Sequence, residues 1–392
     1  MSTAPPRRWD IFCRVIDNYG DIGVSWRLAR QLAHEHGAAV RLWVDQLPVL
    51  RALCPEVDVN AAVQSVQGVR VLPYAEGADY PPPADVVIDA FGGGLPPAYI
   101  AQMAASAVKP LWIVLEYLSA ESWVREHHGL PSPHPQTGLP RYFYFPGVAP
   151  GSGGVLREAD LLARRDAFCA TEDAGAGVND LRAWWSARGF DDVPADAITL
   201  SLFAYPHAPW RELFSACEQG ASPVVAAIPE GPLAAAIREA CRLGQSRRVQ
   251  TGNLELRFVP FVPQLDYDTL LWASDINFVR GEDSFVRAQW AGQPFVWHIY
   301  SQAEAAHEVK LRAFLDVFGE VLPADSARVV RNLWLAWNGV AAAPPLASAW
   351  PEFLACRQAQ RQGLRLWREK LLELGDLAGN LQHFCSGLVA KK

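Results

Sequence analysis

Residues 11–33 read IFCRVIDNYGDIGVSWRLARQLA, and the fold class follows from the pattern of this stretch. Ile11 to Ile16 form a short apolar run of the kind that makes a strand. Apolar residues then recur at 24, 28 and 32, with alanines at 29 and 33, which is helical spacing. The stretch therefore predicts a strand, a polar loop and a helix that begins near Val24.

The same alternation continues along the whole chain. Short apolar runs separated by helix-like segments predict parallel sheets of the doubly wound kind. The expected strands of the first half are Ala39 to Val44, Val69 to Leu72, Asp85 to Phe91 and Leu111 to Leu118. Those of the second half are Ile198 to Tyr205, Pro223 to Pro229, Leu254 to Phe261, Ile276 to Arg280 and Pro294 to Tyr300. Expected helices are Leu233 to Leu243, Ser284 to Trp290, Ala305 to Phe318, Asp325 to Trp337, Phe353 to Leu374 and Leu377 to Leu388.

The pattern also predicts where domains begin and end. A chain of 392 residues exceeds the usual size of one hydrophobic core, which favours two domains. Prolines and glycines punctuate 121–154, where we expect an extended loop, and a helix-like segment at 178–188 precedes the second alternation. We expect domains at 1–175 and 176–365, with a helical tail at 366–392 that packs back on the first.

Composition narrows the class of protein. The net charge of −7 disfavours nucleic acid and anionic membranes as partners. Seven scattered cysteines without a C-x-x-C pair indicate reduced thiols in a cytoplasmic protein. We expect neither a signal peptide nor a membrane-spanning segment, because the first residues lack an apolar run and the longest apolar runs are short. We expect a cytoplasmic protein.

Two carboxylates lie in the first loop, at Asp17 and Asp21. The glycines at 20 and 23 would allow positive φ and a close approach of a ligand to the backbone. One interpretation is structural, with Asp21 capping the helix from Val24 and Asp17 forming an Asx turn. The other is a general base at the edge of a cleft. Both remain open on the residues alone.

Arg280-Gly281-Glu282-Asp283-Ser284 lies between an expected strand and an expected helix. The arginine, the serine hydroxyl and the backbone N–H groups suit a diphosphate at a helix N-terminus, although Glu282 and Asp283 do not suit an anion. Asp283 or Ser284 as an ordinary helix cap is the structural alternative.

Aromatic residues follow the neighbouring strands, and Gln264 lies among them. Such rings can stack on a nucleobase, and an amide can read an imide edge such as that of thymine or uracil. Each ring taken alone is more often a core residue. The aromatics in question are Phe203, Tyr205, Phe261 and Tyr267.

Two further patterns carry weak signals. The turn Asp89 to Pro96 contains three consecutive glycines after a strand, but lacks the G-K-[ST] ending of a phosphate-binding loop. The histidine spacings do not match those of a zinc site, and we expect no metal.

The run from Ile11 to Arg30 closely resembles the opening of the bacterial protein-arginine rhamnosyltransferases that modify elongation factor P, the EarP family. The resemblance continues through 201–205, 261–264 and 280–284, in the family's order, and covers nearly the whole chain. It implies a GT-B fold, in which two Rossmann-like domains face a central cleft. The N-terminal domain would receive the acceptor and the C-terminal domain would bind the nucleotide sugar.

The resemblance also implies the reaction. L-Rhamnose would pass from dTDP-β-L-rhamnose to an arginine of elongation factor P, with inversion and without a metal or other cofactor, to support translation of polyproline stretches. A guanidinium is a poor nucleophile because it stays protonated, so nearby carboxylates make chemical sense. Asp21 would be the general base, Asp17 would orient the acceptor, and Glu282 would be the third catalytic carboxylate.

The same resemblance supplies the donor-binding residues. They are Gly20, Phe203, Tyr205, Phe261, Gln264, Tyr267, Arg280, Gly281, Asp283 and Ser284. Within this set, the rings and Gln264 would surround the thymidine and sugar, whereas Arg280, Asp283 and Ser284 would line the diphosphate and ribose. Two alternatives remain: a GT-B enzyme with another nucleotide sugar and a small-molecule acceptor, and a non-catalytic nucleotide-sugar-binding module.

Overall fold

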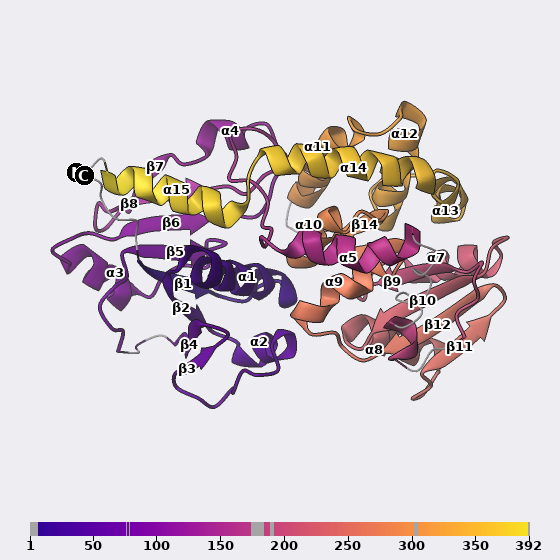
Figure 1. Cartoon of the computed structure of the whole chain (residues 1–392), viewed down its shortest axis with the longest axis horizontal. Coiled ribbons are helices and arrows are strands. Elements are labelled where there is room, and N and C mark those ends of the chain that lie inside the picture. The colour runs from indigo at the N-terminus through magenta and orange to yellow at the C-terminus, as the bar shows by residue number, and fades with distance from the viewer. Residues whose placement is uncertain are drawn as a thin grey trace. The chain divides into compact units, whose positions relative to one another are not determined.

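The computed structural model describes residues 7–75, 77, 79–173, 184–188, 192–301 and 305–390. The chain divides into two compact units, one of Met1–Ala159 with Lys370–Lys392 and one of Asp160–Glu369 (Figure 1). Most of the helix expected at 178–188 lies outside the described residues, and 184–186 are helical.

The first unit is built on an eight-stranded sheet in the order β3-β4-β2-β1-β5-β6-β8-β7. The six inner strands are parallel, and β3 and β7 pair antiparallel at the two edges. Its strands are β1 (Arg8–Cys13), β2 (Ala39–Val44), β3 (Gln64–Val66), β4 (Val69–Pro73), β5 (Val86–Ala90), β6 (Leu111–Leu115), β7 (Pro131–Pro133) and β8 (Pro140–Tyr144).

Helices connect these strands, and the end of the chain returns to the same unit. The longest, α1, ends at Gly37, whose φ of 63° closes the helix in the left-handed conformation that glycine adopts at low cost. Helix α15, yellow in Figure 1, packs against α1, and Asp376 forms an isolated parallel bridge with Val155. The helices of this unit are α1 (Tyr19–His36), α2 (Leu47–Leu53), α3 (Pro97–Ala105), α4 (Val124–His127) and α15 (Leu377–Ala390).

The second unit repeats the design with a six-stranded sheet in the order β11-β12-β10-β9-β13-β14. All pairs are parallel except β11 with β12. The strands are β9 (Ile198–Leu202), β10 (Val224–Pro229), β11 (Arg248–Thr251), β12 (Leu254–Val259), β13 (Ile276–Arg280) and β14 (Phe295–His298).

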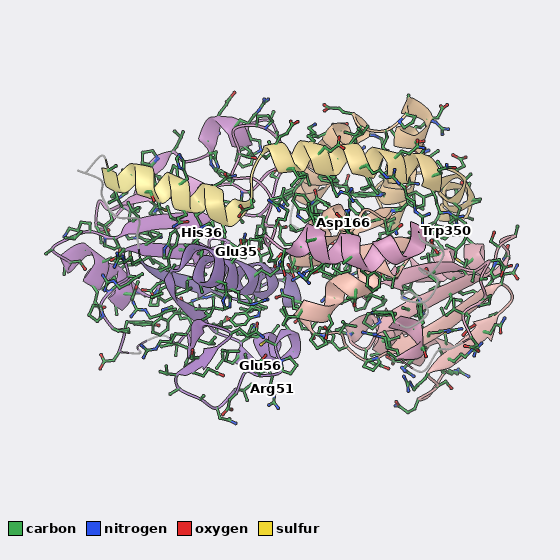
Figure 2. All side chains as sticks on the ribbon, viewed as in Figure 1. Glu35, His36, Arg51, Glu56, Asp166 and Trp350 are labelled. Carbon is green, nitrogen blue, oxygen red and sulfur yellow. The ribbon has the colours of Figure 1, made fainter. Side chains whose placement is uncertain are left out.

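An aromatic core holds the helices of the second unit together. The rings of Phe314 and Trp334 stack 5.7 Å apart, and Trp367 of the long helix α14 lies edge-on to Phe314. Trp350, labelled in Figure 2, is buried on α13. The helices are α5 (Leu161–Asp173), α7 (Trp210–Glu218), α8 (Pro232–Cys241), α9 (Gln264–Trp272), α10 (Asp283–Ala291), α11 (Ala306–Gly319), α12 (Ala324–Trp337), α13 (Leu346–Ala355) and α14 (Arg357–Glu373).

Among the described residues, none of the helices combines the length and apolarity needed to cross a membrane.

Three expectations about these elements are wrong in detail. The stretch 121–154 is not one extended loop, because it contains α4, β7 and β8. Helix α1 begins at Tyr19, five residues before the expected Val24. The segment expected as one helix from 353 to 374 falls within two helices, α13 and α14, that meet at Cys356.

Both sheets reverse their strand order at one point. In the first unit the reversal falls between β1 and β5, and in the second between β9 and β13. Loops that leave the carboxyl ends of two such strands diverge to opposite sides, and ligands of doubly wound sheets bind in the crevice between them. Each unit thus contains one expected binding edge.

Candidate active site

In the first unit the binding edge is formed by the loop from β1 to α1. Asn18, the residue before α1, has φ 37° and ψ −103°, a conformation that is rare outside glycine. Gly20 and Gly23 lie inside α1, and neither has a positive φ. The positive φ expected at these glycines occurs at Asn18 instead. Gly20 donates its N–H to the carbonyl of Asp17, which closes the turn into the helix.

Asp21 lies in the first turn of α1 and is fully buried. Its Oδ2 accepts hydrogen bonds of 2.8 Å from the backbone N–H groups of Ile16 and Asp17. The carboxylate thus holds the loop that precedes its own helix, and the cap expected for a helix from Val24 is not formed. Burial raises the pKa of Asp21, while these two hydrogen bonds and one from Tyr117 lower it.

Asp17, the second carboxylate of the loop, is also buried. Its backbone N–H and carbonyl are both engaged, by Asp21 and Gly20 respectively. Asp17 thus lies in the loop after β1, and Gly20 and Asp21 lie in the first turn of α1.

Tyr117 completes the surroundings of Asp21. Its hydroxyl donates to Oδ1 of Asp21 at 3.0 Å, and its ring stacks on Phe91 with centroids 4.5 Å apart. Tyr117 follows β6, and Phe91 follows β5 with a φ of 59°. The carboxyl ends of three neighbouring strands, β1, β5 and β6, thus contribute to the environment of one carboxylate.

The glycine-rich turn after β5 belongs to the same edge. Asp89 is buried and its Oδ1 accepts the N–H of Gly94 at 2.9 Å. Burial raises the pKa of Asp89 to about 6, and the negative charge of Glu116 adds to the effect. A Cβ at Gly93 would come within 2.9 Å of Cβ of Arg14, so this glycine allows the turn to pack against the end of β1.

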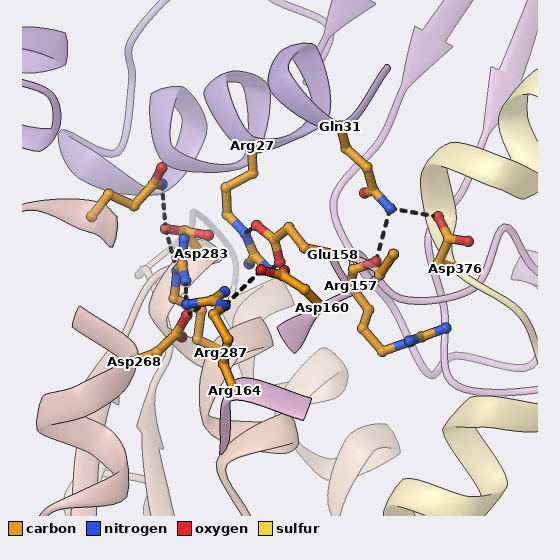
Figure 3. A network of polar contacts seen from close by, with 12 residues as sticks. Arg27, Gln31, Arg157, Glu158, Asp160, Arg164, Asp268, Asp283, Arg287 and Asp376 are labelled. Carbon is orange, nitrogen blue, oxygen red and sulfur yellow. Dashed lines mark hydrogen bonds and ion pairs between the residues drawn. The ribbon is translucent and has the colours of Figure 1, made fainter. Parts of the chain in front are cut away.

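Further along α1, a polar network anchors the helix within its unit (Figure 3). Arg27 has no exposed surface and makes a two-pronged contact with Glu158, with N–O distances of 2.8 and 2.6 Å. One turn on, the amide of Gln31 donates to Asp376 and to Glu35, each at 2.9 Å. Glu35 lies near the end of α1 (Figure 2). These contacts fix the helix that carries Asp21.

In the second unit the binding edge contains a cation that packs on two aromatic rings. The guanidinium carbon of Arg280, the last residue of β13, lies 4.8 Å from the ring centre of Phe203 and 4.6 Å from that of Tyr205. Both rings follow β9, the other strand of the reversal point. Phe203 also meets Tyr267 edge-on at 5.9 Å. Phe203, Tyr205, Tyr267 and Arg280 are therefore brought together.

The loop after β13 turns tightly into α10. Gly281 has a φ of 58°, and its carbonyl accepts the indole N–H of Trp297 at 2.7 Å. Ser284 donates its hydroxyl to the carbonyl of Arg280 at 2.6 Å and accepts the N–H of the same residue at 3.0 Å. Neither Asp283 nor Ser284 is the cap of α10: the capping position is Glu282, which makes no side-chain capping bond.

Glu282 is buried, and Nζ of Lys310 on α11 lies 3.9 Å from its Oε2. This places the third predicted catalytic carboxylate at the carboxyl end of β13, directly after Gly281.

A two-step polar ladder joins the first turns of α9 and α10 (Figure 3). At the start of both helices, the amide of Gln264 donates to Oδ2 of Asp283 at 2.8 Å. One turn further, Arg287 lies between two carboxylates, 2.8 Å from Asp268 and 3.3 Å from Asp283. All four side chains are buried. Phe261, two residues beyond β12, lies half-buried in the loop that leads to α9.

The backbone of Tyr205 is hydrogen-bonded to a buried histidine. His298, at the end of β14, accepts the backbone N–H of Tyr205 at its Nδ1, and burial lowers its pKa to about 3. The ring is therefore neutral near pH 7, with its proton on Nε2. A cavity of about 190 Å³ next to it is lined by His207, His307 and Asn338 among others.

Three of these residues were not predicted from the sequence. Tyr117 was taken as part of a strand, and its partner is 96 residues away. Asp268 and Arg287 did leave a signal, because each stands four residues after a predicted site residue on a helix, Gln264 or Asp283. Residues four apart on a helix lie on one face.

Comparisons with known proteins identify the family. The family model of the elongation factor P (EF-P) rhamnosyltransferase EarP matches residues 9–386. A protein-arginine rhamnosyltransferase of Pseudomonas putida is 46% identical over 96% of this chain and 98% of its own. One of Pseudomonas aeruginosa is 44% identical, with the same coverage.

A solved structure gives the fold. It is described as the structural basis for EarP-mediated arginine glycosylation of translation elongation factor EF-P, and it is 32% identical with a TM-score of 0.64. The match covers 96% of this chain and 98% of that one. The predicted GT-B class, with two Rossmann-like units, is confirmed, as is the resemblance to the family.

Proposed function

Because this chain belongs to the EarP family of elongation factor P rhamnosyltransferases, we propose that it transfers L-rhamnose from dTDP-β-L-rhamnose to an arginine of elongation factor P. The reaction takes place in the cytoplasm and supports translation of polyproline stretches. The observation that carries the proposal is the family match over nearly the whole chain, together with a buried, hydrogen-bonded carboxylate at one binding edge and an arginine packed on aromatic rings at the other.

The acceptor chemistry is assigned to Asp21. A guanidinium must lose a proton as its nitrogen attacks, and a carboxylate with a raised pKa is a better base than an ordinary one. Two backbone N–H groups and Tyr117 hold the Asp21 carboxylate in one orientation. Such preorganisation avoids reordering the base during the reaction. Asp17 orients the acceptor guanidinium.

The donor is assigned to the second unit. The Arg280 guanidinium packs on the rings of Phe203 and Tyr205, where it can meet the negative charge that builds on the departing diphosphate. The N-terminus of α10 adds its backbone N–H groups. Glu282 acts on the sugar side of the same loop. We propose that these groups stabilise the leaving group without a metal or other cofactor.

One experiment tests the proposal. Purified protein, dTDP-L-rhamnose and unmodified elongation factor P should give a mass increase of one deoxyhexose on the factor, mapped to an arginine by peptide fragmentation. Parallel reactions with UDP-glucose and with free arginine test the alternative of a different sugar or a small-molecule acceptor. Binding of dTDP-L-rhamnose without transfer to any acceptor would favour a non-catalytic module and would overturn the proposal.

A further inference from the structure

Asp283 poses an electrostatic problem for the proposed donor site. It is the first residue of α10, where an anionic diphosphate would gain from the N–H groups and dipole of the helix. A carboxylate in this position would compete with the phosphate for the same groups. Asp283 is buried, so water cannot screen its charge effectively.

The ladder between α9 and α10 resolves the problem. Oδ2 of Asp283 points to α9 and accepts from Gln264, and the same oxygen lies 3.3 Å from Nε of Arg287. The guanidinium of Arg287 is 3% exposed and is fixed from its other end by Asp268 at 2.8 Å. An arginine buried between two carboxylates can hold both in place with its fork of N–H groups.

We propose that Arg287 is a positioning residue of the donor site, which neutralises Asp283 and keeps its carboxylate turned toward α9, so that the start of α10 can accept a diphosphate. The inference rests on the proposed function for the identity of the donor. It extends the site by two residues, with Asp268 as the anchor that holds Arg287.

The ladder also fixes the amide of Gln264. Oδ2 of Asp283 accepts from Arg287, and its second partner must therefore be a donor, which identifies the Gln264 atom facing it as Nε2. The carbonyl oxygen of the amide then lies on the side away from Asp283. Asp283 thus orients the Gln264 amide, and Arg287 holds the Asp283 carboxylate that does so.

The test compares a charged ligand with a neutral one. In Arg287→Gln, Asp283 loses its cation, so binding of dTDP should weaken about tenfold or more. Thymidine, which has no phosphate, should lose much less. Calorimetry measures dTDP, and competition against dTDP measures thymidine. The double variant Asp283→Asn with Arg287→Gln should recover dTDP affinity, because the carboxylate charge at 283 is gone and asparagine can still accept from Gln264.

A matched control is available in the same unit. Arg257 of β12 is also fully buried and paired with a carboxylate, Glu255, at 2.6 Å. Arg257→Gln should lower thermal stability without changing the ratio of dTDP to thymidine affinity. Arg287→Lys, which keeps the charge, should keep that ratio near the wild-type value and provides a folded variant if the glutamine variant does not fold.

Two results would overturn the inference: equal losses of dTDP and thymidine binding in Arg287→Gln, or a double variant that binds dTDP no better than the single one. In Arg287→Lys, which keeps the positive charge, a loss of dTDP binding much larger than the loss of thymidine binding also counts against it. Failure of the proposed function looks different, because wild-type protein would then bind dTDP and yet leave elongation factor P without a mass increase.

Discussion

The hydroxyl of Tyr117 donates a 3.0 Å hydrogen bond to Oδ1 of Asp21, the carboxylate oxygen that the loop N–H groups do not occupy. Tyr117 is positioned in turn by the stacked ring of Phe91. Tyr117 follows β6, and Asp21 lies at the start of the helix that follows β1. The two residues therefore meet only when the sheet is folded. In the proposed reaction this bond both aims the base and lowers its pKa.

Removing that hydroxyl should shift the pH dependence of the reaction. Burial already raises the pKa of Asp21, and the bond from Tyr117 opposes this effect, so Tyr117→Phe should raise the pKa further. A general base acts only when it is deprotonated. The pH below which kcat/KM falls, the acid limb of the profile, should therefore move to a higher value. On the alkaline plateau we expect a loss of roughly 2–10-fold, the size of one hydrogen bond.

The matched control is Tyr80→Phe, which removes a hydroxyl that donates to the carbonyl of Ala75 at 2.7 Å in the same unit. Its pH profile should coincide with that of the wild type. An unchanged acid limb in Tyr117→Phe would show that the tyrosine does not act through Asp21.

Substitutions of Asp21 and of Asp17 by asparagine should impair the reaction in different ways. Asn at 21 can accept the two loop N–H groups with its oxygen and donate its amide to Tyr117, so the fold should survive while the base is lost. We expect kcat to fall by about 10²–10⁴-fold. Asp17→Asn should mainly raise KM for elongation factor P, because Asp17 is assigned to orient the acceptor. A larger fall in kcat for the Asp17 variant would exchange the two roles.

Asp89 should make the stability of the protein depend on pH. Folding raises its pKa from 3.8 to about 6, so the folded state binds this proton more tightly than the unfolded chain. The contribution of Asp89 to the free energy of unfolding is therefore largest below pH 4, and it is lost as the pH rises to 6. A difference of about two pH units corresponds to roughly 3 kcal/mol.

Asp89→Asn removes that charge and retains an acceptor for the N–H of Gly94. The variant should be more stable than the wild type at pH 8, by up to roughly 3 kcal/mol, and similar to it at pH 4. Urea unfolding at both pH values measures the difference. A stability difference that stays constant between them would show that titration of the buried Asp89 carboxylate is not the cause.

The sequence predicted the fold where patterns are local. Strands β2 and β13 agree with their expected limits because each is an apolar run bounded by turns. Strands β7 and β8 were missed since prolines occupy 131, 133 and 140, which normally argue against strands. The structure tolerates them because β7 is an edge strand and Pro140 begins β8.

Tertiary contacts explain the rest. Helix α1 begins at Tyr19, where Asp21 holds the backbone of Ile16 and Asp17 through short-range hydrogen bonds that the apolar pattern does not reveal. Most of the predicted site residues follow the strands on either side of the two reversal points, whereas Phe261, Gln264 and Tyr267 follow β12. Tyr117, the partner of Asp21, and the contact of Arg287 with Asp268 depend on pairing between elements and were not predicted. The roles assigned to the site residues stay predictions until the variants are measured.

The motif that resembles the family also contains a residue with no assigned chemistry, Arg27, and its effect should be on stability. Its guanidinium is fully buried and bound at two points by Glu158. Arg27→Met would remove this cation from the Glu158 carboxylate and should cost about 3–5 kcal/mol in urea unfolding. Adding Glu158→Leu removes the carboxylate charge and should restore much of the loss. If the double variant were no more stable than Arg27→Met, lost packing rather than loss of the ion pair would be the cause.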